Sequence, residues 1–508
     1  MKKILCFLLA ILMILSVVAC DTTKDPVDSS DTGASDSVEA IDTVDTTEKV
    51  NTNVIPAEKY NGVFKAGYAR AVITPELPAP VDGTMDDQIM TKVRDDMYAT
   101  CIAFNDGENT ALIYTVDVKN IGPVSYSSIK LRISIATKVP KENIILSATH
   151  SHSAFTPIDN LSKSTSESLK KWSSNLPGVM ADIAKEAIAD MEDAEIYVGR
   201  ANTPNMAFVR RYLHADGTYS IKSTVPGLKS TTPIVGHAAE ADDILQIIRL
   251  VRAEKKDIVM TNWQGHLAAA RDVIPSSVTA DLAFYVRDGV ESNDDDVLVA
   301  YFQGASGNLN LYSPIITLQK YKNYVEVGKA LANTVLETMP VEKLTKLEAG
   351  EIKGVGTTFE AARRKHSAER VKQAEEVMAL EQGSDEQKAL MAKYGFESLY
   401  APKSIIGSTK ESGYREFALS AISFGDLGFI GAPYEMFDDN GVQIKESSPY
   451  SMTFILTCAG GYWGYVPSEM YYTTYGGYEY EVTDFAMGVA EKAVAEFVRM
   501  LKELKGIA

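Results

Sequence analysis

"YATCIAFNDGENTALIYTVDV", residues 98 to 118, carries the clearest fold signal in the chain. Two short apolar runs rich in strand-forming residues flank Asn105-Asp106-Gly107, and this arrangement is typical of a β-hairpin. Similar apolar runs that end in turn residues recur at 143–146, 258–263, 297–302, 418–424, 429–430 and 453–458. The sequence therefore predicts a fold built around several β-strands.

Helical patterns lie between these runs. Residues 178–192 repeat an apolar residue every four positions from Val179, and residues 489–505 carry a second apolar stripe that ends before Gly506. Strands interspersed with helices predict an α/β (mixed α+β) fold, a single large domain of mixed sheets with helices packed on them. Residues 360–398 are charged and helical around a turn at 382–384, which predicts an inserted helical hairpin.

The N-terminus has the pattern of a secretory signal. Two lysines precede the apolar run from Ile4 to Leu15, and small residues lead to Cys20. Because Ala19 directly precedes the cysteine, residues 1–20 resemble a bacterial lipoprotein signal, with an ordinary signal peptide as the alternative. The apolar run is shorter than the roughly 20 residues of a membrane-spanning helix. We expect secretion across the cytoplasmic membrane and anchoring at the cell surface through lipidated Cys20.

Composition changes after the signal. Residues 21–58 are rich in Asp, Thr, Ser and Val without aromatic residues, which predicts a disordered acidic tether before a folded domain over 59–508. The formal net charge of −18, without clusters of Lys and Arg, argues against nucleic acid as a partner. No protein partner is implied. Whether Cys101 and Cys458, the two cysteines of the predicted domain, form a disulfide is left open.

Three of the six histidines lie where a predicted strand gives way to a loop. His150 and His152 follow the apolar run Ile144 to Leu146, and His266 follows "DIVMTNW". Because binding sites collect at strand ends, these histidines are candidates for metal binding or catalysis, with ordinary hydrogen-bonded histidines as the alternative. The stretch "YFQGASGNLNLY" at 301–312 either presents backbone N–H groups to an anionic intermediate or forms a tight turn.

An ordered set of motifs resembles the neutral (non-lysosomal) ceramidase family over about residues 63 to 500. "ATHSHS" is the most specific piece, and the order of the motifs carries more weight than any one of them. The matching segments are "KAGYARAVITP" (65–75), "VRDDMYATCIAFND" (93–106), "TVDV" (115–118), "ILSATHSHSAFTP" (145–157), "NWQGH" (262–266), "FQGASGNLN" (302–310), "GAPYEMF" (431–437) and "GYVPSEMYY" (464–472).

The resemblance implies a catalytic Zn²⁺ with four ligands, which are His150, His266, Glu435 and Tyr465. Imidazole nitrogen and carboxylate oxygen suit zinc, whereas a tyrosine oxygen is a rarer ligand. Nearby tyrosines are alternatives for this fourth position: Tyr462, Tyr471 and Tyr472.

Three further residues gain roles from the resemblance. His152 is expected to face the substrate and either stabilise an oxyanion or pass a proton to the leaving amine. Arg210, in "NMAFVRRYLHADG", is expected to contact substrate, with Arg211 as the alternative alignment. Asp117 is expected to support a ligand histidine through a hydrogen bond.

Two features depart from the family pattern. The family has Ser-Pro-Asn at the end of the glycine-bearing stretch, where this chain has Asn310-Leu311-Tyr312, and family members with ceramidase activity continue into an immunoglobulin-like domain. Asn310 lacks a nucleophilic oxygen, although its amide can donate a hydrogen bond to an oxyanion. These departures question ceramide as the substrate more than they question hydrolysis.

The resemblance thus implies a zinc-dependent amidohydrolase that cleaves an N-acyl linkage in a lipid or small-molecule substrate, with ceramide as the first expectation. One alternative is a metal-dependent hydrolase of a different amide or of an ester. Another is a non-catalytic surface lipoprotein that binds a solute or glycan.

Overall fold

A computed structural model describes residues 51, 53–81, 88–164, 166–220, 232–409 and 413–507. The predicted signal over 1–20 and residues 21–50 and 52 of the predicted tether lie outside these residues. Within the described part of the chain, no helix combines the length and the apolar character that crossing a membrane requires.

The larger sheet contains nine strands of mixed direction, and the predicted hairpin forms its β5–β6 pair. Most neighbours are antiparallel, but β14–β16 and β6–β7 are parallel. In spatial order the strands are β16 (Val297–Gln303), β14 (Asp257–Trp263), β13 (Ile244–Arg252), β8 (Glu192–Asn202), β1 (Lys65–Val72), β5 (Tyr98–Asn105), β6 (Thr110–Val116) and β7 (Ile144–Ala148), with β18 (Thr345–Leu347) also paired to β8.

A four-stranded sheet faces the larger one. It is ordered β19 (Lys353–Ala362), β20 (Tyr414–Phe424), β21 (Leu427–Gly431) and β23 (Met452–Leu456). Phenylalanines from both sheets meet between them: Phe104 lies 4.7 Å from Phe424, and Phe302 lies 6.4 Å from Phe454, between ring centroids. Alternation places Phe104 in this inter-sheet core, whereas its neighbour Ala103 faces the helices on the other side.

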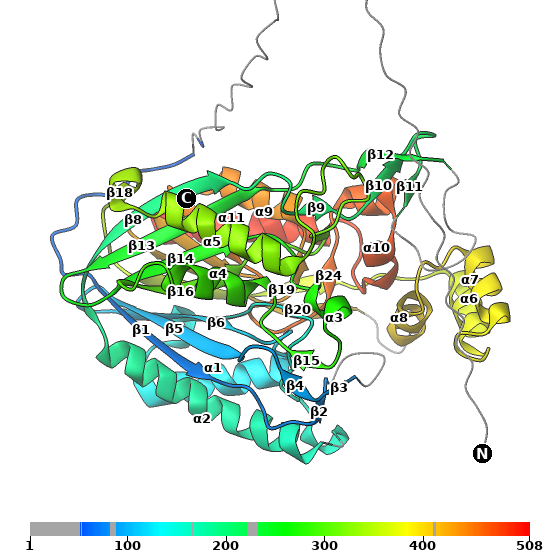
Figure 1. Ribbon diagram of the computed structural model, residues 1–508, viewed down its shortest axis with the longest axis horizontal. Helices are drawn as coiled ribbons and strands as arrows, with labels where there is room; N and C mark the ends of the chain where they lie inside the picture. Colours follow the sequence, from blue (N-terminus) through cyan, green and yellow to red (C-terminus); the bar gives the residue numbers. More distant parts are fainter. Residues whose placement is uncertain are drawn as a thin grey trace, which may run out of the picture. The chain divides into compact units, whose positions relative to one another are not determined.

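Helices cover the outer faces of both sheets (Figure 1). α1 (Pro123–Thr137) and α2 (Glu167–Ala189) pack over β1, β5 and β6, whereas α4 (Leu282–Glu291) and α5 (Tyr324–Thr338) cover the half that contains β14 and β16. α11 (Val489–Lys505) packs its apolar stripe against β19 and β20. These layers confirm the mixed α/β fold.

The helix predicted over 178–192 differs from α2 in its bounds and in its buried face. α2 begins after Ser166, whose side chain accepts a hydrogen bond from the Leu169 amide, and it continues through Pro177. Val179 is exposed, whereas Met180 and Ile183 are buried. The four-residue spacing therefore identified a helix but assigned Val179 to the wrong face.

The segment predicted as a helical hairpin contains α6 (Ala368–Met378) and α7 (Asp385–Tyr394), followed by a third helix, α8 (Tyr400–Ser408). Residues 360–362 belong instead to β19. The three helices enclose a small apolar core that includes Val377, Phe396 and Ile405. Such a core stabilises the insertion between β19 and β20.

Shorter elements connect these layers. The short helices are α3 (Ala270–Val273), α9 (Asp438–Ser447) and α10 (Tyr478–Val482), with a π-helical turn at Tyr471–Tyr475 and 3₁₀ turns at Lys141–Asn143, Leu161–Lys163 and Val341–Lys343. The short strands are β2 (Ala79–Pro80), β3 (Ile89–Met90), β4 (Lys92–Val93), β9 (Phe208–Val209), β10 (Tyr212–His214), β11 (Tyr219–Ser220), β12 (Ile234–His237), β15 (Ser277–Val278), β17 (Leu309–Asn310), β22 (Glu435–Met436) and β24 (Tyr465–Val466).

Candidate metal centre

The two parallel strand pairs bring the histidines together. His150 follows β7, and His266 follows β14. Although these strands lie toward opposite edges of the larger sheet, the edges approach each other, because Thr115 Oγ1 on β6 donates a hydrogen bond to the Tyr301 carbonyl on β16 at 2.5 Å. His150 has a φ of +62°, an uncommon value for a residue other than glycine, at the turn where the chain leaves β7.

Glu435 and Tyr465 come from another pair of strands. β22 and β24 run parallel with Glu435 directly opposite Tyr465, and the Glu435 amide donates to the Gly464 carbonyl at 2.9 Å. Both side chains are largely buried. This register places a carboxylate and a phenol on neighbouring strands beside the histidines, although the two residues are 30 positions apart in sequence.

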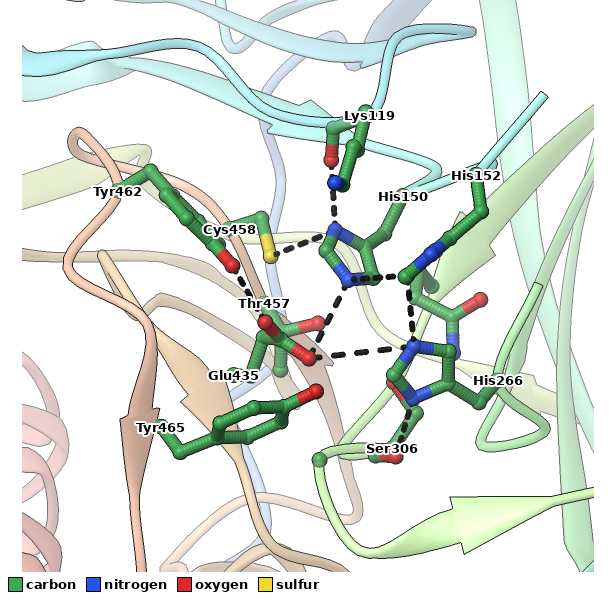
Figure 2. A network of polar contacts seen from close by, with 12 residues as sticks. Lys119, His150, His152, His266, Ser306, Glu435, Thr457, Cys458, Tyr462 and Tyr465 are labelled. Atoms are coloured by element: carbon green, nitrogen blue, oxygen red, sulfur yellow. Dashed lines mark hydrogen bonds and ion pairs between the residues drawn. The ribbon is translucent and has the colours of Figure 1, made fainter. Parts of the chain in front are cut away.

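Three imidazoles and one carboxylate converge, as Figure 2 shows. His152 Nε2 lies 3.3 Å from His150 Nε2 and 3.1 Å from His266 Nε2. Glu435 Oε2 lies 3.2 Å from His150 Nε2 and 3.9 Å from His266 Nε2. Of the His, Cys, Asp and Glu side chains that the structure describes, only these three histidines form a group whose mutual ligand-atom distances suit a metal ion.

Backbone carbonyls determine which imidazole nitrogens are protonated. His150 Nδ1 lies 2.6 Å from the Lys119 carbonyl oxygen, and His266 Nδ1 lies 3.0 Å from the Ser306 carbonyl oxygen. A carbonyl oxygen only accepts, so both Nδ1 atoms carry a proton and donate. Both Nε2 atoms are then free to offer their lone pairs to one point, as in metal sites whose ligand histidines are held through the other nitrogen.

The two oxygens of Glu435 have different surroundings. Its Oε1 accepts a hydrogen bond from the Tyr462 hydroxyl at 2.5 Å, whereas its buried Oε2 makes no hydrogen bond within the described structure. Tetrahedral zinc with bonds of roughly 2.0–2.1 Å holds its ligand atoms about 3.3 Å apart. The separation between Glu435 Oε2 and His150 Nε2, 3.2 Å, is close to this value, and that to His266 Nε2, 3.9 Å, is wider. The donor set therefore fits a divalent metal ion such as zinc.

The electrostatics also favour a cation between these groups. Burial opposes the charged form of His150, but the Glu435 carboxylate outweighs burial and raises the pKa of His150 to about 10. Burial together with Arg210 and His150 lowers the pKa of His266 to about 3, and burial and the neighbouring histidines hold the pKa of His152 well below its usual range. Without a metal, a proton on His150 compensates Glu435, and metal binding would displace that proton.

Arg210 and Tyr465 lie beside the histidines and Glu435 and contact each other. Arg210 Nη2 donates to the Tyr465 hydroxyl at 3.0 Å and to the Gly307 carbonyl at 2.7 Å, while its Nε donates to buried Glu479. Tyr465 makes no hydrogen bond with a histidine among the described residues, but its hydroxyl points toward the Glu435 carboxylate (Figure 2). The alternative arginine, Arg211, donates instead to the Tyr475 carbonyl, at 2.5 Å, and pairs with Glu397.

Asp117 does not support a ligand histidine, contrary to the sequence-based expectation. Its carboxylate accepts two hydrogen bonds from Arg287, at 3.0 and 2.6 Å, and one from the Tyr98 amide at 3.0 Å. The supporting position at His150 Nδ1 is taken by the Lys119 carbonyl. Lys119, two residues after Asp117, makes that contact, whereas the Asp117 carboxylate faces the buried guanidinium of Arg287.

Asn310 is tied to neighbouring residues. Its Oδ1 accepts a hydrogen bond from the Tyr312 amide at 3.0 Å, and its Nδ2 makes a long contact of 3.5 Å with the Tyr212 hydroxyl. β17, which contains Asn310, pairs with β9, so Asn310 lies opposite Phe208, which precedes Arg210 by two residues.

For several residues near the metal centre, the sequence predicted no role or left the role open. Tyr462, named only as a possible substitute for Tyr465, contacts Glu435. Glu479, which holds Arg210, had no sequence signal apart from its position after a run of aromatic residues. Cys458 Sγ lies 3.6 Å from His150 Nδ1, and both Cys458 and Cys101 are buried free thiols, which answers the open disulfide question.

Comparisons with known proteins support the fold. No protein-family model and no curated protein matches the sequence significantly. Among solved structures, the neutral ceramidase from Pseudomonas aeruginosa aligns with a TM-score of 0.62 and 15% identity over 88% of this chain and 75% of that chain. A structure described as ceramidase complexed with C2 aligns with a TM-score of 0.63 and 15% identity, covering 88% and 76%. The chain therefore has the fold of these ceramidase structures.

Proposed function

We propose that this protein is a metal-dependent hydrolase of the neutral ceramidase type that cleaves an N-acyl amide bond, with zinc as the metal. The observation that carries the proposal is the convergence of the His150 and His266 Nε2 atoms, at 3.2 and 3.9 Å, on Glu435 Oε2, a buried oxygen without a hydrogen bond in the described structure. The fold shared with ceramidase structures supports the same reaction class.

The ligand set in this proposal is His150, His266 and Glu435, with Tyr465 beside them. A zinc ion held by these residues would supply the Lewis acidity needed to polarise the scissile carbonyl and to make water nucleophilic at neutral pH. The protein holds two ligand imidazoles in a fixed orientation through the Lys119 and Ser306 carbonyls. Addition of water to the amide carbonyl and cleavage of the C–N bond yield a carboxylic acid and an amine.

His152 has a different part in this mechanism. It is more exposed than the other two histidines, and its Nδ1 has no hydrogen-bond partner among the described residues, so the protein does not fix its protonation. A neutral imidazole with one unconstrained nitrogen suits proton transfer. We assign to His152, as a group that contacts substrate, the transfer of the proton released by the attacking water to the leaving amine nitrogen.

Arg210 supplies a fixed positive charge next to this group. Its Nε and Nη2 are occupied by Glu479, Gly307 and Tyr465, whereas Nη1 makes no hydrogen bond with a described residue. A guanidinium held at two of its nitrogens loses little freedom when the third donates to substrate. Nη1 is the donor that we assign to the substrate's carbonyl or hydroxyl oxygen.

We also propose that the substrate is a lipid and that the enzyme is anchored at the cell surface through Cys20. An acyl chain is the part that ceramides share with other N-acyl lipids, and the replacement of the family serine by Asn310 makes N-acyl amines other than ceramide equal candidates. Cys20→Ser would release the protein from the membrane fraction if lipidation anchors it. Retention of that variant in membranes would contradict the anchor.

Release of free fatty acid tests the reaction. Zinc-loaded protein is incubated with ceramide, with N-acyl amines that lack the sphingoid chain, and with the corresponding esters. We expect amide turnover that is lost in His150→Ala and His266→Ala and retained in His366→Ala, a control histidine on the loop before α6. Turnover of esters alone would change the bond assigned, and turnover of no substrate would favour a binding protein.

A further inference from the structure

Tyr462 contacts the metal centre without being one of its ligands. It follows Gly460 and Gly461, whose φ values of +108° and +116° suit only glycine, in the segment between β23 and β24. A side chain at Gly460 would also collide with the Ala418 carbonyl, at 2.3 Å from the Cβ position. This turn is therefore closely constrained, and Figure 2 shows the Tyr462 hydroxyl directed at the Glu435 carboxylate.

The hydrogen bond divides the carboxylate into two unlike oxygens. Tyr462 donates to Glu435 Oε1 at 2.5 Å, while Oε2 lies 3.2 Å from His150 Nε2 and has no hydrogen bond. The Tyr462 ring also stacks on the His150 ring, with centroids 6.0 Å apart and an interplanar angle of 30°. One tyrosine thus touches both a carboxylate and an imidazole of the proposed ligand set.

A carboxylate can bind a metal through one oxygen or through both, and a hydrogen bond to one oxygen favours binding through the other. We propose that Tyr462 is a positioning residue that holds Glu435 in the one-oxygen arrangement and so sets metal affinity and coordination. The inference rests on the proposed function, because it requires a metal at this centre. It assigns Tyr462 a role distinct from that of Tyr465, which the sequence left unresolved.

Metal affinity of Tyr462→Phe provides the first test, measured by competition with a chromophoric zinc chelator. The substitution removes one hydroxyl and leaves the ring on His150, and we expect affinity to weaken by roughly 10- to 100-fold, as for other groups that orient metal ligands. Tyr472→Phe is the matched control, since its hydroxyl donates at 2.8 Å to the Phe485 carbonyl. We expect parental affinity from this control.

Cobalt substitution separates positioning from a general loss of structure. Visible absorption of Co²⁺ depends on coordination number, so release of Oε1 to the metal in Tyr462→Phe changes the spectrum, whereas Tyr472→Phe leaves it unchanged. A third comparison uses Glu435→Ala alone and with Tyr462→Phe: if Tyr462 acts through Glu435, the second change adds little to the loss of affinity.

The outcomes are distinct. Parental zinc affinity and cobalt spectrum in Tyr462→Phe would overturn the inference while leaving the proposed function intact. If Tyr462→Phe lowered zinc affinity equally in the presence and absence of the Glu435 carboxylate, Tyr462 would act by another route, and this result would also overturn the inference. A parent protein that binds no metal would overturn the proposed function and this inference together.

Discussion

Replacing Asp117 with alanine separates a structural role from a role at the metal centre. Asp117 and Arg287 have side-chain exposures of 1% and 3%, and two hydrogen bonds of 3.0 and 2.6 Å join them. Removal of the carboxylate leaves the guanidinium charged and buried and also frees the Tyr98 amide. Breaking a buried pair of this kind costs about 3–5 kcal/mol of unfolding free energy.

Urea denaturation followed by intrinsic fluorescence measures this cost, and zinc affinity is determined for the same variant. Glu496→Ala is the control, because the Arg499–Glu496 pair lies at the surface, with side-chain exposures of 53% and 23%, and surface pairs contribute about 1 kcal/mol or less. We expect Asp117→Ala to lose stability and to retain the affinity of its folded fraction for zinc. Loss of zinc affinity with a change in stability below about 1 kcal/mol would refute this reasoning and restore the sequence-based role.

Further predictions concern packing, thiols, pH and metal removal. Leu501→Ala on α11 should destabilise the protein by about 2–5 kcal/mol in urea denaturation, because that side chain is fully buried. Alkylation should leave Cys101 and Cys458 unmodified in the folded protein and modify both after unfolding without reductant, as detected by mass spectrometry. Burial and Glu397 raise the pKa of Glu481 to about 8 from an ordinary 4.5, so the folded state holds this proton more tightly than the unfolded state does. The contribution of protonated Glu481 to stability should therefore be complete below about pH 4.5 and be lost as pH rises through about 8. In urea denaturation at a series of pH values, Glu481→Gln should reduce the dependence of stability on pH over this range. Removing zinc with a chelator should lower stability by about 2.7 kcal/mol relative to protein at a free zinc concentration of 100 Kd.

Strands were easier to predict than helix limits. The hairpin around Asn105-Asp106-Gly107 combines apolar runs with a turn that matches them, and both signals are local. α2 was harder, because the apolar spacing that predicted it began only at Val179, after Pro177, and a proline is unfavourable inside a helix. In the structure the helix extends N-terminally from Pro177, where Leu169 and Leu176 pack into the core and offset the lost backbone hydrogen bond.

At the metal centre, too, some residues could be predicted from local sequence signals and others could not. The histidines could be proposed from their positions after apolar strands, because strand ends are recognisable locally. Glu435 and Tyr465 could be named only through resemblance to a family, since their proximity depends on the pairing of β22 with β24. The same limit explains Asp117, whose position within the motif "TVDV" did not reveal Arg287, 170 residues later, as its partner.

Metal content tests the central claim most directly. Protein incubated with zinc, freed of unbound ions and analysed by mass spectrometry for metal per chain should contain one zinc ion. His150→Ala and His266→Ala should contain little, while His366→Ala should match the parent. A parent protein that retains no zinc or other divalent metal, or histidine variants that retain as much as the parent, would contradict a metal centre built on His150, His266 and Glu435.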